Sequence, residues 1–276
     1  MHTYRSANAK LSYLDRGKGP PVIFLHPTPL DHFYWLPLLE ELRGIRAILP
    51  DLRGHGASEL GSNLTMGGFS LVPDAPVLTM AALAQDSLAL LDSLGIESAI
   101  FAGCSIGGYV LLELWRQAPH RVSGLAFICS KPQPDAEANL KKRAAIIAQV
   151  RTGQSDALFD GMAQSLTGST SRKNRPAIVS ELRARMTLSP EALVATQAGL
   201  ATRPDSLPTV ATIRVPVFAI AGGEDTAIAV DDMHAFEAAP GGCTFHVLAD
   251  AGHFAAYEHP RAVALQFSQW LQNLPR

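Results

Sequence analysis

The chain has 276 residues, 47% of them hydrophobic, which is enough to bury a large core in one α/β domain with an insertion. Its 23 Lys and Arg against 25 Asp and Glu give a formal net charge of -2. No net basic field is therefore available to attract nucleic acid or an anionic membrane, and we expect neither as a partner.

The N-terminal stretch and the cysteines bear on the cellular compartment. Residues 1–17 mix charged and polar side chains and lack the apolar core of a signal peptide, and the sequence has no run of 18 uncharged apolar residues. Cys104, Cys129 and Cys243 lie in apolar stretches without CxxC spacing, which favours buried free thiols over disulfides or a metal site. The sequence thus predicts a cytoplasmic protein without a metal. It leaves open whether the chain forms a homo-oligomer.

Strand and helix patterns alternate through the first half of the chain. Short apolar runs typical of strands covered on both faces occupy residues 20–26, 45–51, 98–103 and 122–130. Helical patterns occupy residues 31–44, 80–95 and 109–118, and the Gly- and Pro-containing stretch 60–78 is expected to be a long irregular loop. This alternation predicts a mostly parallel sheet with right-handed crossovers.

A different pattern fills the middle of the chain. Residues 132–203 contain only helical patterns, which predicts a helical cap inserted into the sheet domain. Alternation then resumes with strands at 215–223 and 243–249 and helices near 229–239 and 260–273. We therefore expect a core domain formed by residues 1–131 and 204–276, with the cap at 132–203.

One polar residue stands at the junction of a predicted buried strand and the helix after it. Residues 103–107, Gly-Cys-Ser-Ile-Gly, fit the pattern G-x-S-x-G in that strand-to-helix setting. Such a turn holds its central residue in a strained conformation, so its neighbours two positions away need to lack side chains. Ser105 would then project above the sheet, and the backbone N–H of Ile106 would be free to donate. The alternative is a glycine-rich turn that contains a serine by chance.

A serine nucleophile needs a base, and the base needs a carboxylate to orient it. His253 follows the last predicted strand and Asp225 follows the strand before it, so both are expected at the carboxyl edge of the sheet together with Ser105. Glu224 is the rival carboxylate, but its place one residue earlier favours Asp225. With Asp225 as the carboxylate, the three residues follow one another along the chain in the order Ser, Asp, His.

Along nearly its full length the chain resembles the α/β-hydrolase superfamily, in its esterase and lactonase branch. The stretches that carry the resemblance are VIFLHPTPLDHFYW, LPDLRGHGAS, the segment from TMAALAQ to GLAFI around Ser105, RPDSLPTVATIRVPVFAIAGGEDTAI and LADAGHFAAYEHP. The resemblance implies an α/β-hydrolase fold, a mostly parallel sheet flanked by helices. It also implies Ser105 as nucleophile, His253 as base and Asp225 as its partner, in agreement with the residue-based choice. The nearest similarity is to 3-oxoadipate enol-lactonase-like proteins.

The stretch His26-Pro27-Thr28-Pro29 departs from the His-Gly-apolar pattern of these relatives. Neither proline has an N–H group, so of the three residues after His26 only Thr28 can donate from its backbone. We therefore expect an oxyanion hole formed by Thr28 and Ile106, and we hypothesise that the Thr28 hydroxyl adds a third donor. The alternative is a rigid turn without catalytic consequence.

Two further sets of residues have open assignments. Four apolar side chains either line the substrate pocket or belong to the core, namely Trp35, Phe33, Phe159 and Met162. His55 and Arg53 are expected to have a structural role rather than to bind a ligand.

The predicted activity is hydrolysis of a small carboxylic ester or lactone through a Ser-His-Asp triad and an acyl-enzyme, with no cofactor. A perhydrolase or cofactor-free haloperoxidase, and a hydrolase of carbon–carbon bonds, would use the same triad. A small-molecule receptor that keeps the pocket and turns over slowly is an alternative from another functional class.

Overall fold

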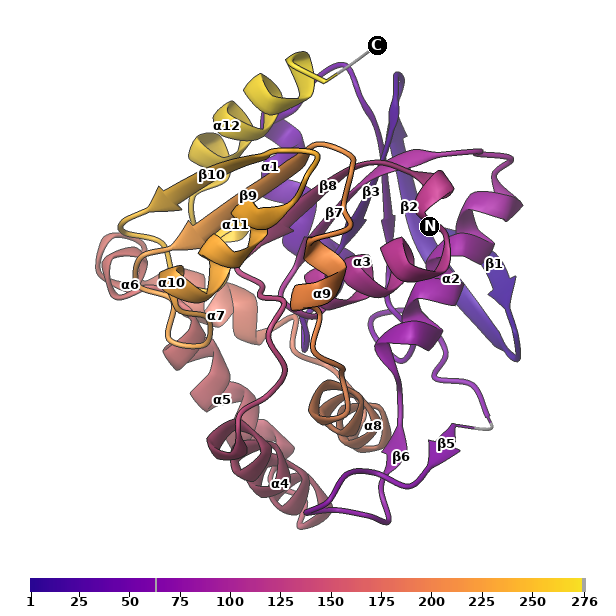
Figure 1. The fold of residues 1–276 in the computed structure, drawn as a ribbon. Helices are drawn as coiled ribbons and strands as arrows, with labels where there is room; N and C mark the ends of the chain where they lie inside the picture. Colours follow the sequence, from indigo (N-terminus) through magenta and orange to yellow (C-terminus); the bar gives the residue numbers. More distant parts are fainter. Residues whose placement is uncertain (63, 275–276) are drawn as a thin grey trace.

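An eight-stranded sheet forms the centre of the molecule in the computed structural model, which describes residues 1–62 and 64–274 (Figure 1). In spatial order the strands are β1 (His2–Ser6), β2 (Ala9–Gly17), β4 (Arg46–Pro50), β3 (Pro21–Leu25), β7 (Ala99–Cys104), β8 (Val122–Ile128), β9 (Val217–Gly222) and β10 (Cys243–Leu248). All pairs from β4 to β10 are parallel, and the pairs β1/β2 and β2/β4 are antiparallel. The predicted mostly parallel α/β fold is confirmed.

Helices cover both faces of the sheet, which is why its central strands are continuous apolar runs. One face carries α2 (Met80–Ser93) and α3 (Ile106–Gln117), and the other carries α1 (Leu36–Glu41) and α12 (Pro260–Gln272). Alternate strand residues enter the two layers: Phe24 packs in the cluster that contains α1 and α12, and Phe101 in the cluster that contains α2 and α3. Each fully buried Phe of this kind stabilises the fold by roughly 1.5–3 kcal/mol.

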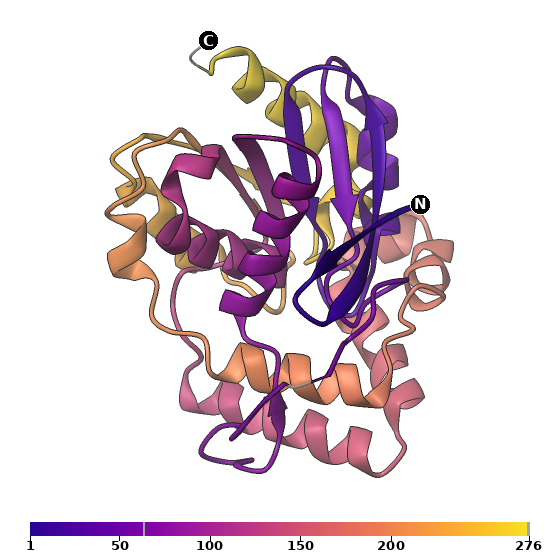
Figure 2. The same cartoon turned by 90° about the vertical axis from the view of Figure 1, so that its right-hand side faces the viewer.

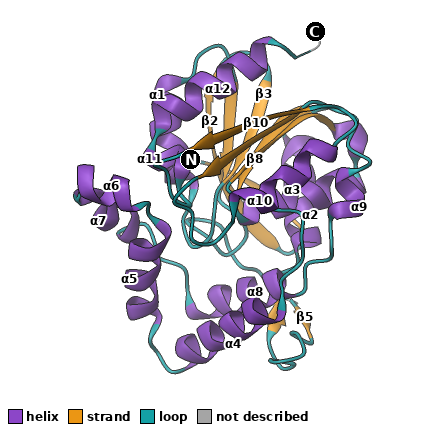
Figure 3. Ribbon diagram, turned by 60° about the vertical axis from the view of Figure 1, so that its left-hand side comes forward, coloured by secondary structure: helices purple, strands orange, loops and turns teal. Residues whose placement is uncertain are grey.

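Between β8 and β9 the chain forms helices only. The first five are α4 (Glu137–Arg151), α5 (Ser155–Leu166), α6 (Ser169–Asn174), α7 (Ala177–Arg183) and α8 (Pro190–Ala201). Figures 2 and 3 show α4, α5 and α8 beyond one end of the sheet. That end is the one where β7, β9 and β10 terminate, so these helices lie over the edge at which Ser105, Asp225 and His253 were predicted to meet.

Several boundaries differ from the predictions. The stretch expected to be irregular contains a short antiparallel pair, β5 (Thr65–Met66) and β6 (Pro76–Val77), and β6 packs on α8. The helix expected at 229–239 is α10 (Val230–Met233) followed by a 3-10 helix (His234–Ala238). The remaining short elements are α9 (Leu207–Val210), α11 (Ala255–Glu258) and 3-10 helices at His32–Trp35 and Pro119–Arg121.

Two further observations concern the bulk of the molecule. The three cysteines are free thiols, as predicted, and Cys104 and Cys129 are buried. Among residues 1–62 and 64–274, no helix has the length and hydrophobicity needed to cross a membrane.

Candidate active site

Ser105 occupies the sharp turn between β7 and α3. Its backbone has φ 53° and ψ -115°, a conformation that residues with side chains rarely adopt. A Cβ on Gly103 would collide with the backbone of Gly107, and a Cβ on Gly107 would collide with the carbonyl of Leu25. Both glycines are therefore required for the chain to turn so tightly, and this is the physical meaning of the G-x-S-x-G pattern here.

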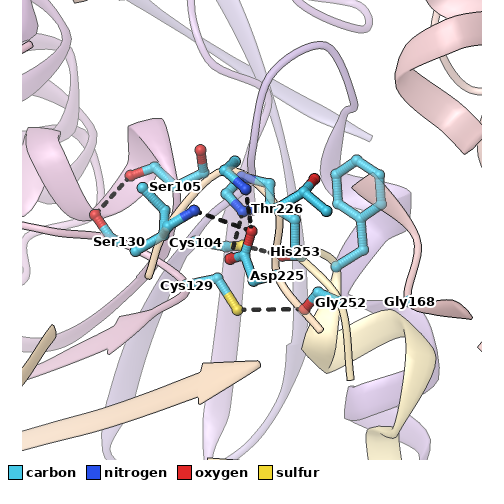
Figure 4. A network of polar contacts seen from close by, with 12 residues as sticks. Cys104, Ser105, Cys129, Ser130, Gly168, Asp225, Thr226, Gly252 and His253 are labelled. Carbon is cyan, nitrogen blue, oxygen red and sulfur yellow. Dashed lines mark hydrogen bonds and ion pairs between the residues drawn. The ribbon is translucent and has the colours of Figure 1, made fainter. Parts of the chain in front are cut away.

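The strained turn is held by hydrogen bonds to its main chain. The N–H of Ser105 donates to the carbonyl of Ile128 at 3.1 Å, and the hydroxyl of the fully buried Ser130 donates to the carbonyl of Ser105 at 2.9 Å (Figure 4). A Cβ on Gly108 would collide with that Ser130 hydroxyl. Ile128 at the end of β8 and Ser130 after it thus hold the Ser105 backbone in place. The role of Ser130 was not predicted from the sequence.

Asp225 and His253 are in contact at the carboxyl ends of β9 and β10. Asp225 Oδ2 lies 2.8 Å from His253 Nδ1, and the two side chains are 1% and 4% exposed (Figure 4). The other carboxylate oxygen, Oδ1, accepts the N–H groups of Ala227 and Ile228 at 2.7 and 3.1 Å. These contacts leave Nδ1 of the imidazole as the hydrogen donor and Nε2 as the basic nitrogen.

The rival carboxylate has other partners. Glu224 accepts hydrogen bonds from the N–H and the hydroxyl of Thr170 at 2.8 and 2.6 Å. These hydrogen bonds lower the pKa of Glu224. Asp225, and not Glu224, therefore lies against His253.

The loop that carries His253 is anchored by a buried carboxylate, Glu258. Its Oε2 accepts the N–H groups of Gly168 and Gly252 at 2.9 and 3.0 Å, and its Oε1 accepts that of Phe254 at 3.1 Å. The N–H of His253 in turn donates to Leu166 O at 2.8 Å. The segment after α5 and the histidine loop are thus joined directly. Sequence analysis missed Glu258; its only signal was an acidic residue in an otherwise apolar stretch after His253.

Two thiols lie beneath the same loop. Cys104 Sγ is 3.6 Å from the carbonyl of His253, and Cys129 Sγ is 3.6 Å from that of Gly252 (Figure 4). Burial raises the pKa of both thiols above the ordinary value. They are therefore packed thiols and not thiolate nucleophiles.

A cavity of about 520 Å³ lies over this edge of the sheet. Its walls include Ser105, His253 and Thr28, together with side chains from the helices between β8 and β9. Within the described residues no hydrogen bond joins the Ser105 hydroxyl to His253, although both side chains face the same cavity. A serine and an imidazole that share a cavity, with a carboxylate behind the imidazole, are the groups that acyl transfer requires.

The two N–H groups expected to stabilise an oxyanion are unengaged. Within residues 1–62 and 64–274, neither Thr28 N–H nor Ile106 N–H donates to another group of the protein. Ile106 is the first residue of α3, where backbone N–H groups lack intrahelical acceptors. Both donors therefore stay available at the rim of the nucleophile turn.

The Thr28 hydroxyl does not serve as a third donor to the cavity. His55 Nδ1 lies 3.0 Å from the carbonyl of Arg53, so Nδ1 carries the hydrogen, and Thr28 Oγ1 lies 3.0 Å from His55 Nε2. Complete burial lowers the pKa of His55 to about 3, which keeps Nε2 without a proton. The hydroxyl hydrogen must then point to Nε2, and the structure contradicts the third-donor hypothesis.

His26 and His55 form a buried neutral pair with ring centroids 5.2 Å apart. His26 Nδ1 lies 3.1 Å from the carbonyl of Pro27, and its Nε2 accepts the N–H of Leu52 at 2.9 Å. Burial lowers the pKa of His26 as well, despite the opposing charge of Asp51. A proton on Nε2 of His26 would face the N–H of Leu52, and a proton on Nε2 of His55 would remove the acceptor of the Thr28 hydroxyl.

This pair predicts acid sensitivity. The unfolded chain takes up protons on both rings near pH 6.5, whereas the folded chain resists until about pH 3 at His55, so folding is progressively destabilised as pH falls below about 6.5. Well below pH 6.5 the His55 ring contributes a slope of up to about 1.4 kcal/mol per pH unit to the free energy of unfolding, and the lowered pKa of His26 adds a contribution of the same sign. Urea unfolding between about pH 7 and pH 5 measures the slope. His55→Gln should reduce it by one ring's contribution, whereas Leu111→Ala should destabilise the fold without changing it; an equal slope in His55→Gln and the wild type would contradict the prediction.

The apolar residues considered for the pocket have different positions. Met162 lines the cavity. Trp35 is fully buried and packs on Phe24 and Tyr34, and the ring of Phe33 lies under the guanidinium of Arg185 at 3.8 Å. Phe159 is buried beneath Arg183, which lies 5.5 Å from its ring. Trp35, Phe33 and Phe159 are not among the residues that line the cavity.

Two further observations concern polar side chains outside the contact between Asp225 and His253. Arg53 and Asp86 make a buried ion pair at 2.5 Å, which agrees with the structural role expected for Arg53. In the part of the chain that the structure describes, no group of three or more His, Cys, Asp or Glu side chains could hold a metal ion.

Comparison with known proteins gives one family model and several relatives that match most of the chain. A model described as "Alpha/beta hydrolase family" matches residues 22–266. The 3-oxoadipate enol-lactonase 1 of Acinetobacter baylyi is 24% identical over 93% of this chain and 90% of its own length. A non-heme bromoperoxidase, BpoC of Mycobacterium tuberculosis, named as putative, is 26% identical over 92% of this chain and 94% of its own length.

The fold has solved counterparts. A thermophilic esterase from Thermogutta terrifontis superposes with a TM-score of 0.86 at 29% identity, over 96% of this chain and 94% of its own. The enol-lactonase from Burkholderia xenovorans LB400 superposes with a TM-score of 0.85 at 22% identity, over 99% and 100% of the two chains.

Proposed function

The chain belongs to the alpha/beta hydrolase family, whose model matches residues 22–266, and from this premise we propose that it cleaves a small carboxylic ester or lactone through Ser105, His253 and Asp225. The observation that carries the proposal is the shared cavity: Ser105 and His253 both face it, and Asp225 lies 2.8 Å behind the imidazole. The esterase and enol-lactonase relatives support this reaction class over others on the same fold.

In the first half of the reaction Ser105 Oγ attacks the substrate carbonyl and transfers its proton to His253 Nε2. Asp225 keeps the hydrogen on Nδ1 and stabilises the imidazolium that forms. The imidazolium then protonates the leaving alcohol, and an acyl-enzyme remains on Ser105. Water, deprotonated by the same Nε2, attacks the acyl-enzyme. When this second tetrahedral intermediate collapses, the imidazolium returns the proton to Ser105 Oγ and the acid is released.

The backbone N–H groups of Thr28 and Ile106 would bind the oxyanion of both tetrahedral intermediates. The unengaged state of both donors supports this role. Each donor of this kind lowers the barrier by roughly 3 kcal/mol. The hydrogen bond from the Thr28 hydroxyl to His55 would hold the Thr28 backbone in place and turn its oxygen lone pairs, rather than a donor, toward the cavity.

We also propose that residues 132–203 act as a cap on this site. The cavity that contains Ser105 takes part of its wall from α4, α5 and α8, which lie between β8 and β9. The hydrogen bonds that Glu258 makes to both Gly168 and Gly252 would keep the cap in register with the histidine loop. Substrate shape would then be selected by the cap, and the chemistry by the sheet edge.

Perhydrolysis is the second candidate function. The similarity to a bromoperoxidase over 92% of the chain favours it over carbon–carbon bond cleavage or a receptor role. It would follow the same route to the acyl-enzyme, with hydrogen peroxide in place of water as the second nucleophile. Comparing the acid and the peracid released from one ester in the presence of peroxide distinguishes the two functions.

Covalent labelling tests the proposal. A fluorophosphonate reacts with a serine only where a base and an oxyanion hole activate it, so one equivalent should attach and mass spectrometry should place it on Ser105. An activated aryl ester should show a burst of one equivalent of phenol followed by steady turnover. Absence of labelling, or labelling that persists in Ser105→Ala, would show that Ser105 is not the nucleophile.

A further inference from the structure

The cavity above Ser105 is strongly cationic, although the chain as a whole carries a net charge of -2. Its lining contains four basic side chains and one acidic side chain, and these are Lys131, Lys142, Arg143, Arg203 and Asp135. The chain as a whole has more acidic than basic residues, so its composition does not explain an excess of basic side chains around one cavity. It creates a positive potential where the substrate binds.

One face of α4 supplies two of these basic side chains, Lys142 and Arg143. Asn139, Lys142, Arg143 and Ile146 follow the spacing i, i+3, i+4, i+7, which places them along one side of a helix. From the sequence, this segment was predicted only to be helical. Lysine and arginine on a cap helix are usually solvated, so only their position over Ser105 indicates a role.

An ion-pair cluster, Arg143–Asp135–Arg203, forms part of the lining of this cationic region. Asp135 pairs with Arg143 Nε and, at 2.8 Å, with Arg203 Nη2, and the Asp135 and Arg203 side chains are 2% and 4% exposed. Burial alone would raise the pKa of Asp135, but the hydrogen bonds and charges of the two arginines lower it. The cluster therefore contains two cations and one anion and keeps a net positive charge.

The donors of the cluster exceed its acceptors. Arg203 also donates to the carbonyls of Leu200 and Gln133 and lies 4.3 Å from the ring of Tyr109, yet among the described residues its buried Nε has no hydrogen-bond partner. A buried guanidinium N–H without an acceptor costs free energy.

The two lysines of the lining, Lys131 and Lys142, differ in exposure and in their partners. Lys131 pairs with Asp232 at 2.7 Å, so part of its charge is compensated. Lys142 is exposed, and no ion pair of the described residues includes it. A ligand would thus meet the exposed Lys142, which has no anionic partner among the described residues, and the less exposed Arg143 and Arg203.

We propose that the preferred substrates are esters or lactones that carry a carboxylate on the acyl part, held by Lys142 and by Arg143, whose Nε pairs with Asp135. This inference rests on the proposed function, because it assigns the acyl group to the cavity that Ser105 faces. Planar guanidinium groups suit carboxylates, and a partly enclosed site strengthens their attraction. Among the described residues, a neutral acyl chain would leave Lys142 without an anionic partner.

The experiment compares two isosteric substrates, mono-p-nitrophenyl adipate and p-nitrophenyl adipamate, which differ by a terminal carboxylate against an amide. Spontaneous hydrolysis is subtracted. We expect kcat/KM to favour the adipate by about tenfold to a hundredfold, the range that a charged hydrogen bond provides. The preference should also weaken as salt rises from about 10 mM to about 0.5 M, because the open side of the cavity is screened.

Variants then locate the preference. Arg143→Met and Lys142→Gln should each reduce the adipate-to-adipamate ratio of kcat/KM by about tenfold, mainly through the adipate's KM. Their controls, Arg151→Met and Lys141→Gln, remove the same charges from exposed positions of α4 that do not line the cavity, and should keep the wild-type ratio. Arg143→Lys retains charge and should restore part of the preference, which also covers the case that Arg143→Met folds poorly.

The outcomes separate this inference from the proposed function. If the adipamate is hydrolysed through Ser105 but the adipate is not preferred, or if the control variants reduce the ratio equally, the carboxylate site is refuted and the esterase remains. If neither ester is turned over by the wild type, the proposed function itself fails. A preference that is lost only in the α4 cavity variants supports the carboxylate site.

Discussion

Replacing Ser105 with alanine is expected to lower kcat for an activated aryl ester by about 10⁴-fold to 10⁶-fold, with little change in KM. The variant keeps the cavity and the N–H groups of Thr28 and Ile106, but it has no atom that can form the acyl-enzyme. Alanine fits the position sterically, because Ser105 and alanine carry the same Cβ at φ 53°. Steady-state hydrolysis measures the loss, and the burst of phenol should disappear with it.

Ser180→Ala is the matched control. Ser180 is exposed on α7, where its hydroxyl donates to the carbonyl of Ala177 at 2.8 Å, away from the cavity. It should retain wild-type kcat and burst amplitude. If Ser105→Ala kept more than about a hundredth of the wild-type kcat, well above the residual rate left by a missing nucleophile, a different group would have to attack the ester.

The features of this site that depend on residues close in the sequence, or on the order of the strands, could be predicted from the sequence. The turn at Ser105 requires glycines at two positions close to it in the sequence, so the pattern could be recognised locally. Gly103 is required by a contact within the turn, and Gly107 by the carbonyl of Leu25 on the neighbouring strand. The pairing of Asp225 with His253 depends on strand order, but parallel strands share one carboxyl edge, so two residues that each follow a strand could be placed together in advance.

Features that depend on distant packing were not predicted. Trp35 and Phe159 are apolar residues whose spacing suits a core or a pocket, and only the neighbouring Phe24 and Arg183 decide that they lie outside the cavity. The role of the Thr28 hydroxyl depends on His55, a residue 27 positions away that accepts its hydrogen. No local pattern reveals such a partner.

The N-terminal hairpin of β1 and β2 shows the same limit in the fold. β1 is exposed at three of its five positions, and it therefore lacks the continuous apolar run by which the central strands were identified. The start of α3 at Ile106 rather than near Tyr109 has a related cause. Two glycines follow Ile106, which weakens the local helical signal, but the turn at Ser105 forces the helix to begin at once.

Substituting Asp225 with asparagine is expected to lower kcat by about 10⁴-fold while the fold is retained. Asp225 Oδ1 accepts two N–H groups, from Ala227 and Ile228, so the asparagine would keep its oxygen there and turn its NH₂ toward His253. Facing a donor, Nδ1 must become the acceptor and Nε2 must carry the hydrogen, and the imidazole then cannot take the proton of Ser105.

Glu224→Gln is the control for this substitution, since it neutralises the adjacent carboxylate, which hydrogen-bonds to Thr170 instead of His253. It should change kcat by less than about tenfold, the effect of one altered hydrogen bond on the position of the cap. Steady-state kinetics of the two variants, with circular dichroism to verify folding, measures the contrast. Equal losses in Asp225→Asn and Glu224→Gln would mean that the general negative charge of this loop matters, and that the tautomer of His253 does not depend on Asp225.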